Sequence, residues 1–174
     1  LFIFQGSLSE GRGIEMLLNA FSKNDKKKHV VFMGNGVLEN VVKEYENNFS
    51  NIHHHPAVKP EKITIYTKSA DVGISLTENT CLNHFYSLPN KVFEYILSGL
   101  PIIVSDFPDM GKIVDEYKCG WKVPVEENAI KAIINTITQD IIYEKRVNAL
   151  HAKDHFGWHL EEPILLSVYR KLGF

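Results

Sequence analysis

Residues 87–105 read SLPNKVFEYILSGLPIIVS, and this segment contains the patterns of a helix and of a strand in succession. Its first half carries apolar residues at helical spacing, and Pro89 stands at the helix start, where proline is tolerated. Its second half, after Gly99 and Pro101, is a short run of β-branched residues. We therefore predict a helix over residues 89–98 and a buried strand over residues 101–105. The buried stripe of the helix consists of Val92, Phe93, Ile96 and Leu97.

The same alternation of strand and helix runs through the rest of the chain. Apolar runs predict further strands at residues 1–5, 29–33, 51–55, 71–75 and 121–123. Helical periods predict helices at residues 13–22, 37–48, 60–68 and 110–117, a polar loop over 76–87, and a helical tail from residue 128. This order predicts an α/β fold with a doubly wound, mainly parallel sheet and helices on both faces. We expect residues 1–174 to form one domain, with the tail on the sheet or reaching toward a partner domain.

Composition excludes several classes of protein. The 174 residues carry a net charge of -2, which gives no reason to expect a nucleic-acid partner. The two cysteines, Cys81 and Cys119, form no disulfide framework and no CxxC metal motif, so we expect a reducing, cytoplasmic location. The longest apolar stretch is interrupted by Glu94, Gly99 and Pro101 and cannot span a membrane. Because the chain opens on a strand without Met, we expect an N-terminal domain to be absent from it.

Two basic residues stand where helices begin. Arg12 precedes the helix at 13–22 in a loop with three glycines, and Lys91 lies in the first turn of the helix at 89–98. A cation opposes the helix dipole there, unless an anion binds between them. In a parallel sheet both loops lie at the carboxyl edge, where ligands bind. The pair therefore indicates a diphosphate site, although a solvated Arg12 is an equally good interpretation of its loop taken alone.

Glu94 lies one turn after Lys91, on the same flank of the helix. It is placed to accept hydrogen bonds from sugar hydroxyls. The alternative is a surface Lys91–Glu94 pair, which would contribute only a few tenths of a kcal/mol.

Two other motifs are weaker. Gly34-Asn35-Gly36 lacks the third glycine of a dinucleotide fingerprint, because Glu39 replaces it. His53-His54-His55 lies in a strand, where adjacent side chains point to opposite faces, so the three cannot bind one metal ion. We predict no metal site and a structural role for the histidines.

The motifs together resemble a known family. Residues 88–105 resemble the signature of retaining, GT-B-fold glycosyltransferases of the family 4 type, and residues 69–75 resemble the strand that leads to its donor loop. Residues 5–8 with 12–14, and residues 32–36, are similar to its first two strand–loop units. The resemblance implies a Rossmann-like, donor-binding C-terminal half of a GT-B fold.

The resemblance also implies roles for individual residues. Glu94 matches the second glutamate of the family's E-x7-E motif, which holds the ribose, and Arg12 matches a basic residue on the diphosphate. With Lys91 they form the expected catalytic set. Further nucleotide contacts are expected from Gly6, Ser7, Ala57, Leu88 and Asn90.

The chain departs from the family pattern at two positions. Tyr86 stands at the first glutamate of E-x7-E, and Ser7 replaces an arginine that many members carry. Contacts to the donor sugar are therefore expected to pass to Asn83, His84 or Tyr86.

The implied activity is transfer of a sugar from a nucleotide sugar, UDP-linked by expectation, to a glycan or lipid-linked acceptor with retention. No metal or other cofactor is implied. The acceptor would bind through the absent N-terminal domain, and the full-length enzyme could associate peripherally with the inner face of the cell membrane. The alternatives are a nucleotide-sugar epimerase of the same fold and a non-catalytic nucleotide-sugar-binding module.

Overall fold

The computed structural model describes residues 1–24 and 26–173. Its centre is a six-stranded parallel sheet in the order β3-β2-β1-β4-β5-β6, which confirms the predicted α/β class. The strands are β1 (Phe2–Gln5), β2 (Val30–Met33), β3 (Ile52–His55), β4 (Val72–Ser75), β5 (Ile102–Ser105) and β6 (Gly120–Val123). Strand order reverses between β1 and β4, and in doubly wound sheets a crevice for ligands opens at that point.

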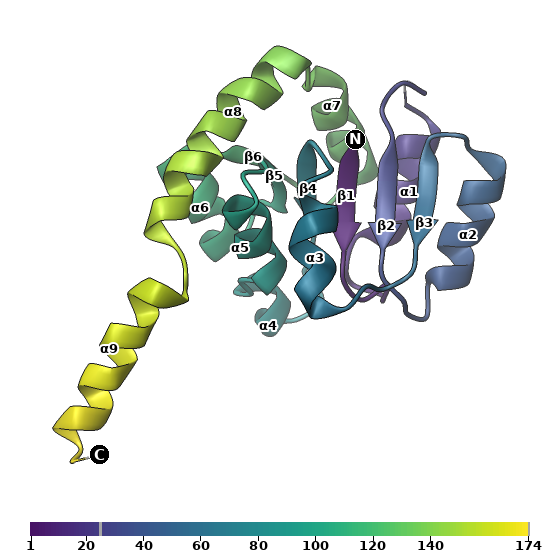
Figure 1. Cartoon of the computed structure of the whole chain (residues 1–174). Coiled ribbons are helices and arrows are strands. Elements are labelled where there is room, and N and C mark those ends of the chain that lie inside the picture. Colours follow the sequence, from purple (N-terminus) through teal and green to yellow (C-terminus); the bar gives the residue numbers. More distant parts are fainter. Residues whose placement is uncertain (25, 174) are drawn as a thin grey trace.

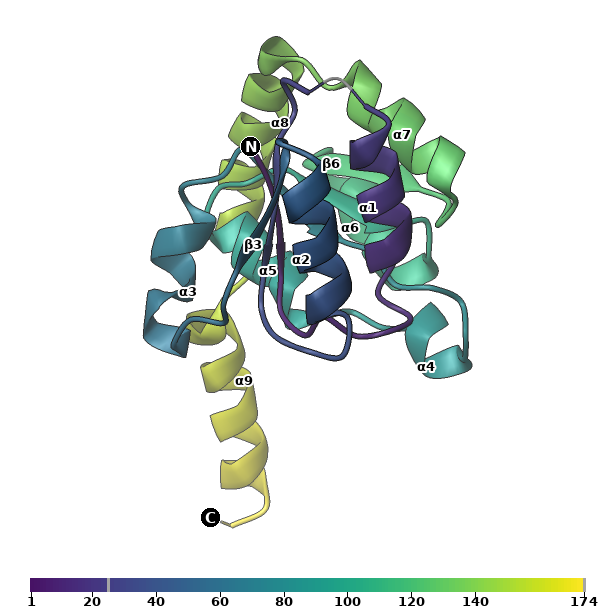
Figure 2. The same ribbon diagram turned by 90° about the vertical axis from the view of Figure 1, so that its right-hand side faces the viewer.

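Helices cover both faces of the sheet (Figures 1 and 2). One face carries α1 (Ile14–Ser22), α2 (Glu39–Asn48) and α7 (Glu127–Thr136), whose apolar side chains share one core with the sheet. The opposite core is formed with α5 (Asn90–Leu97), α6 (Pro108–Tyr117) and α8 (Gln139–Ala152), and α3 (Pro60–Thr67) lies beside α5. The parallel strands on both sides of β1 require crossover connections, and such connections are almost always right-handed, which places helices on both faces of the sheet.

The predicted elements are confirmed with small shifts at their ends, and one helix was not predicted. Residues 76–87, expected to be a polar loop, contain the four-residue α4 (Leu82–Phe85). A single turn is too short to show a helical period in the sequence. Within the tail, α7 and α8 pack on the sheet layers, and the 3-10 turn η1 (Lys153–His155) leads to α9 (Trp158–Lys171). Figure 1 shows α9 extending away from the other layers. Within the described ranges, no helix combines the length and apolarity that crossing a membrane requires.

Tyr95 fixes α5 against the point where strand order reverses. Its ring lies over Gly73 of β4, where a Cβ atom would overlap it. Its buried hydroxyl accepts a hydrogen bond from the backbone N–H of Gln5 at 3.0 Å and lies near the carbonyl oxygens of Ile3 and Ile74. The neighbouring residues of α5, including Glu94, are therefore held at the carboxyl end of β1.

Candidate nucleotide-sugar site

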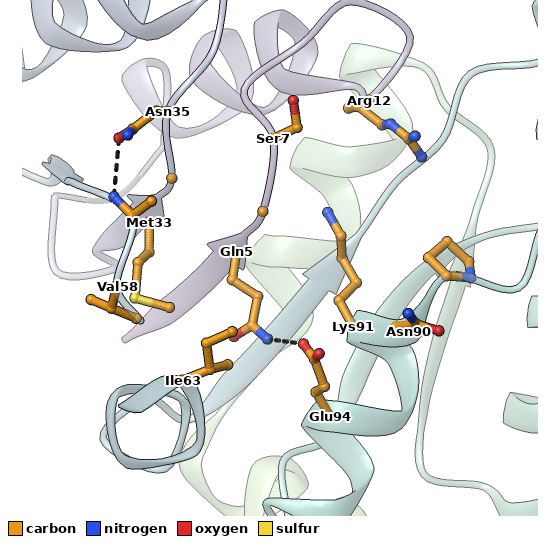
Figure 3. Close-up of a pocket in the computed structure, with 14 residues that line it drawn as sticks. Gln5, Ser7, Arg12, Met33, Asn35, Val58, Ile63, Asn90, Lys91 and Glu94 are labelled. Atoms are coloured by element: carbon orange, nitrogen blue, oxygen red, sulfur yellow. Dashed lines mark hydrogen bonds between the residues drawn. The ribbon is translucent and has the colours of Figure 1, made fainter. Parts of the chain in front are cut away.

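A cavity of about 440 Å³ opens at the carboxyl edge of the sheet, in the range usual for small-ligand sites. Figure 3 shows its side chains converging from the ends of β1 and β2, the segment after β3, and α5. Its lining consists of Gln5, Gly6, Ser7, Arg12, Met33, Gly34, Asn35, Ala57, Val58, Ile63, Pro89, Asn90, Lys91 and Glu94. The structure thus brings together most of the residues that the sequence analysis selected.

Lys91 and Arg12 form a cationic end of the cavity. Both residues line the cavity, as Figure 3 shows, and the Lys91 Nζ atom lies 3.8 Å from the centre of the Phe4 ring. Burial lowers the pKa of Lys91 to about 7; the nearby Arg12 charge contributes to this shift and Glu94 opposes it. When an anionic ligand binds beside this amine, the amine gains a proton, because the anion stabilises the charged form.

The amino end of α1 has a hydrogen-bond partner within the chain. A carboxylate oxygen of Glu78 accepts the hydrogen bond of the Gly13 N–H at 3.1 Å. One donor of that helix terminus is therefore already paired within the chain. On the α1 side, Arg12 and the backbone of Gly6 and Ser7 line the cavity.

Glu94 is not paired with Lys91. Among the described residues the only hydrogen bond of its side chain joins its Oε2 atom to the Nε2 of Gln5, at 2.5 Å, which contradicts the alternative of a surface Lys91–Glu94 pair. Gln5 is 3% exposed and was not selected from the sequence as a site residue. An available signal was its polar side chain at the end of the apolar strand Phe2–Gln5.

The opposite end of the cavity is apolar. Met33, Val58 and Ile63 line it, as Figure 3 shows. The Oδ1 atom of Asn35 accepts a hydrogen bond from the Ala57 N–H at 3.0 Å, which ties the segment after β3 to the end of β2. The cavity therefore has a cationic end, a central carboxylate and an apolar end formed by backbone and hydrocarbon.

Several predicted residues lie outside this lining. Leu88, Asn83, His84 and Tyr86 are not part of it, and their roles stay predictions. His84 contacts the Thr80 hydroxyl at 2.8 Å through its Nδ1, and the Tyr86 ring packs edge-on against Phe85.

The two weaker motifs have structural explanations. A Cβ atom at Gly34 would overlap the carbonyl oxygen of Gly6, and one at Gly36 would overlap that of Leu8. These glycines allow the ends of β1 and β2 to approach closely.

The three consecutive histidines have separate partners. His53 stacks on His29, His54 lies 3.1 Å from the Gly34 carbonyl, and His55 lies 2.7 Å from that of Pro56. Within residues 1–24 and 26–173, no group of three His, Cys, Asp or Glu side chains could hold a metal ion.

The sheet order and the position of the cavity define a Rossmann-like α/β domain with a ligand site at the reversal of strand order. The sequence model of a family described as glycosyl transferases group 1 matches residues 1–140, and the chain belongs to this family. The resemblance noted in the sequence is thereby confirmed at the level of the family.

Individual relatives agree with the family. Spore coat protein SA of Bacillus subtilis (strain 168) is 25% identical over 185 residues, which cover 98% of this chain and 48% of that protein. A glycosyltransferase from Rickettsia africae ESF-5 matches with a TM-score of 0.74 and 17% identity, over 98% of this chain and 47% of that one. Anabaena HepE, crystallised with UDP and glucose, matches with a TM-score of 0.71 and 17% identity, over 88% of this chain and 43% of that one. The structural matches are likenesses of fold, and the chain spans about half the length of the curated relative.

Proposed function

We propose that this chain is the donor-binding part of a glycosyltransferase that takes a UDP-linked sugar as donor. The observation that supports this proposal best is the order of groups along the cavity. Two cations at one end suit a diphosphate, the carboxylate of Glu94 suits ribose hydroxyls, and the apolar end suits a base. The HepE structure with UDP and glucose, which has the same fold, supports the choice of UDP as the first ligand to test.

In this proposal Arg12 and Lys91 bind the diphosphate, together with Gly6, Ser7 and Asn90 of the cavity lining. As the bond to the sugar breaks, negative charge accumulates on the departing diphosphate. Fixed cations close to that charge stabilise the transition state more than the ground state. The roles of Arg12 and Lys91 in binding and in catalysis are thus the same electrostatic interaction at two stages.

The proposal also includes the acceptor of the sugar. We propose a glycan or lipid-linked acceptor and transfer with retention, with the acceptor held by another part of the parent protein. Alignment of two bound reactants and exclusion of water would then require both parts. Peripheral contact with the inner face of a membrane would also belong to that other part.

Calorimetric titration of the wild-type chain with UDP, GDP, ADP and uridine tests the proposal. We expect UDP to bind. Arg12→Ala and Lys91→Ala should each lower the affinity for UDP about tenfold to a hundredfold, since a hydrogen bond to a charged group contributes roughly 1.5–3 kcal/mol. Uridine affinity should change little in both variants, because uridine has no phosphate.

Exposed basic residues supply matched controls. Arg170→Ala on α9 and Lys112→Ala on α6 remove the same charges outside the cavity lining and should leave UDP binding unchanged. Equal losses of affinity for UDP and for uridine in the Arg12 and Lys91 variants would contradict the proposal that these two residues bind the phosphates. Absence of binding by every nucleotide would contradict the proposal as a whole.

A further inference from the structure

Gln5 belongs to a chain of hydrogen bonds that joins three elements of the fold. Thr67, the last residue of α3, places its Oγ1 atom 2.7 Å from the Oε1 of Gln5. The Nε2 of Gln5 in turn reaches Oε2 of Glu94 on α5. Figure 3 shows the second of these contacts at the cavity wall. Gln5 and Thr67 are both buried, so this network is shielded from solvent.

The chemistry of the three groups gives the network one direction. An ionised Glu94 carboxylate only accepts, so the Gln5 amide must turn its NH₂ group toward it. The amide oxygen then faces Thr67, whose hydroxyl must donate to it. The same hydroxyl lies 2.8 Å from the carbonyl oxygen of Ile63, which competes for its single proton. The orientation of the Gln5 amide therefore depends on the Thr67 hydroxyl at one end and on Glu94 at the other.

This arrangement leaves half of the carboxylate available. Among the described residues, Oε1 of Glu94 has no hydrogen-bond partner, and Glu94 lines the cavity. The neutral amide restricts the motion of the carboxylate without cancelling its negative charge, which a lysine or arginine would do. A flexible glutamate would lose rotamer freedom on binding a ligand, whereas a held one has lost it already.

We infer that Gln5, oriented by Thr67, is a positioning residue that holds Oε2 of Glu94 and presents Oε1 to the ribose hydroxyls of the nucleotide. The inference rests on the proposed function, because it assigns Glu94 to the ribose. It adds two buried residues, on β1 and α3, that determine how strongly the site distinguishes a ribose from a sugar without hydroxyls.

The test compares UDP with 2′,3′-dideoxy-UDP, which lacks both ribose hydroxyls. The ratio of the two affinities measures the ribose contribution alone. Thr67→Val keeps the shape of the side chain and removes its hydroxyl, and Gln5→Met keeps the length and removes the amide. We expect both substitutions to reduce the ratio, by about threefold to tenfold, as loss of one hydrogen bond predicts. Thr67→Ser retains the hydroxyl and should restore the wild-type ratio.

Controls separate positioning from a merely structural role. Thr64→Val makes the same substitution at an exposed residue of α3 and should leave the ratio unchanged. In a Glu94→Gln background, Gln5→Met should have no further effect on the ratio, because the group it positions is altered. Melting curves of the free proteins show whether each variant folds. If Gln5→Met does not fold, the comparison of Thr67→Val with Thr67→Ser decides the test.

The possible results are distinct. An unchanged ratio of the two affinities in folded Thr67→Val and Gln5→Met would overturn the inference, including the case in which both affinities fall by the same factor. If the wild-type chain binds UDP and prefers it to the dideoxy compound, such a result leaves the proposed function intact. If the wild-type chain does not bind UDP, the proposed function fails and this inference fails with it.

Discussion

Binding of a nucleotide sugar should transfer a proton from solvent to Lys91. In the unliganded protein, burial and the nearby Arg12 lower the pKa of Lys91 to about 7. At pH 8 about nine-tenths of the Lys91 side chains are then neutral, and at pH 6 about one-tenth are. A bound diphosphate favours the charged ammonium and raises this pKa again. Each binding event should therefore take up about 0.9 proton at pH 8 and about 0.1 at pH 6.

Calorimetry in buffers of different ionisation enthalpy measures this proton count. UDP-glucose is the suitable ligand, because its phosphate diesters do not titrate near neutrality. Lys91→Met, which keeps an unbranched side chain but cannot be protonated, should take up no proton at pH 8. Uridine should cause no uptake in the wild type, since it brings no negative charge to the cationic end. Above pH 7 the affinity of the wild type for UDP-glucose should fall about tenfold per pH unit.

Two results would refute this reasoning. One is the same proton count in wild type and Lys91→Met, which would mean that another group titrates. The other is an affinity for UDP-glucose that is constant between pH 6 and pH 8 in the wild type, which would mean that Lys91 is charged before the ligand arrives or does not touch phosphate.

Four further outcomes are expected. The free energy of unfolding of the unliganded wild type should rise relative to Lys91→Met between about pH 7 and pH 10, because the unfolded chain holds its lysine proton to about pH 10 and the folded chain does not; denaturant titrations at several pH values check the sign, and a fall would contradict it. Glu94→Gln should weaken uridine and UDP alike by roughly 1–3 kcal/mol, since an amide presents a donor where the ribose needs an acceptor; unchanged uridine affinity in calorimetry would remove the ribose role. Tyr95→Phe leaves the buried Gln5 N–H without its acceptor and should lower the free energy of unfolding by about 1–3 kcal/mol in urea titrations, and an unchanged transition midpoint would show that the bond adds nothing. The 174-residue chain alone should bind UDP without transferring sugar to an acceptor, and efficient transfer in a radiolabel assay would contradict the need for a second part.

Much of the fold can be predicted from the sequence because its elements have strong local patterns. The β-branched and aromatic runs at residues 2–5 and 102–105 are short, buried strands, and the stripe that contains Val92 and Ile96 has a clear helical period. The convergence of Arg12 and Lys91 can be predicted as well. Both follow strands of one parallel sheet, and the carboxyl ends of such strands meet at one edge.

The contacts that depend on strand order could not be predicted. Gln5 is 89 residues from Glu94 and 62 from Thr67, and they meet because β1 is central and α3 and α5 lie on the same face. Alternation of strands and helices is compatible with several strand orders, so it does not identify these partners. The hydrogen bond from Gly13 to Glu78 is of the same kind, because it joins the loops that follow β1 and β4.

The central claim is that a nucleoside diphosphate binds at the carboxyl edge of the sheet, with its phosphates between Arg12 and Lys91. Titration of the isotope-labelled chain with UDP, followed by amide NMR shifts, tests this most directly. We predict saturable shifts that cluster at Gly6, Asn35 and Asn90, with the Gly6 and Asn90 shifts absent when uridine replaces UDP. Shifts confined to other parts of the chain, or none at millimolar UDP, would contradict it.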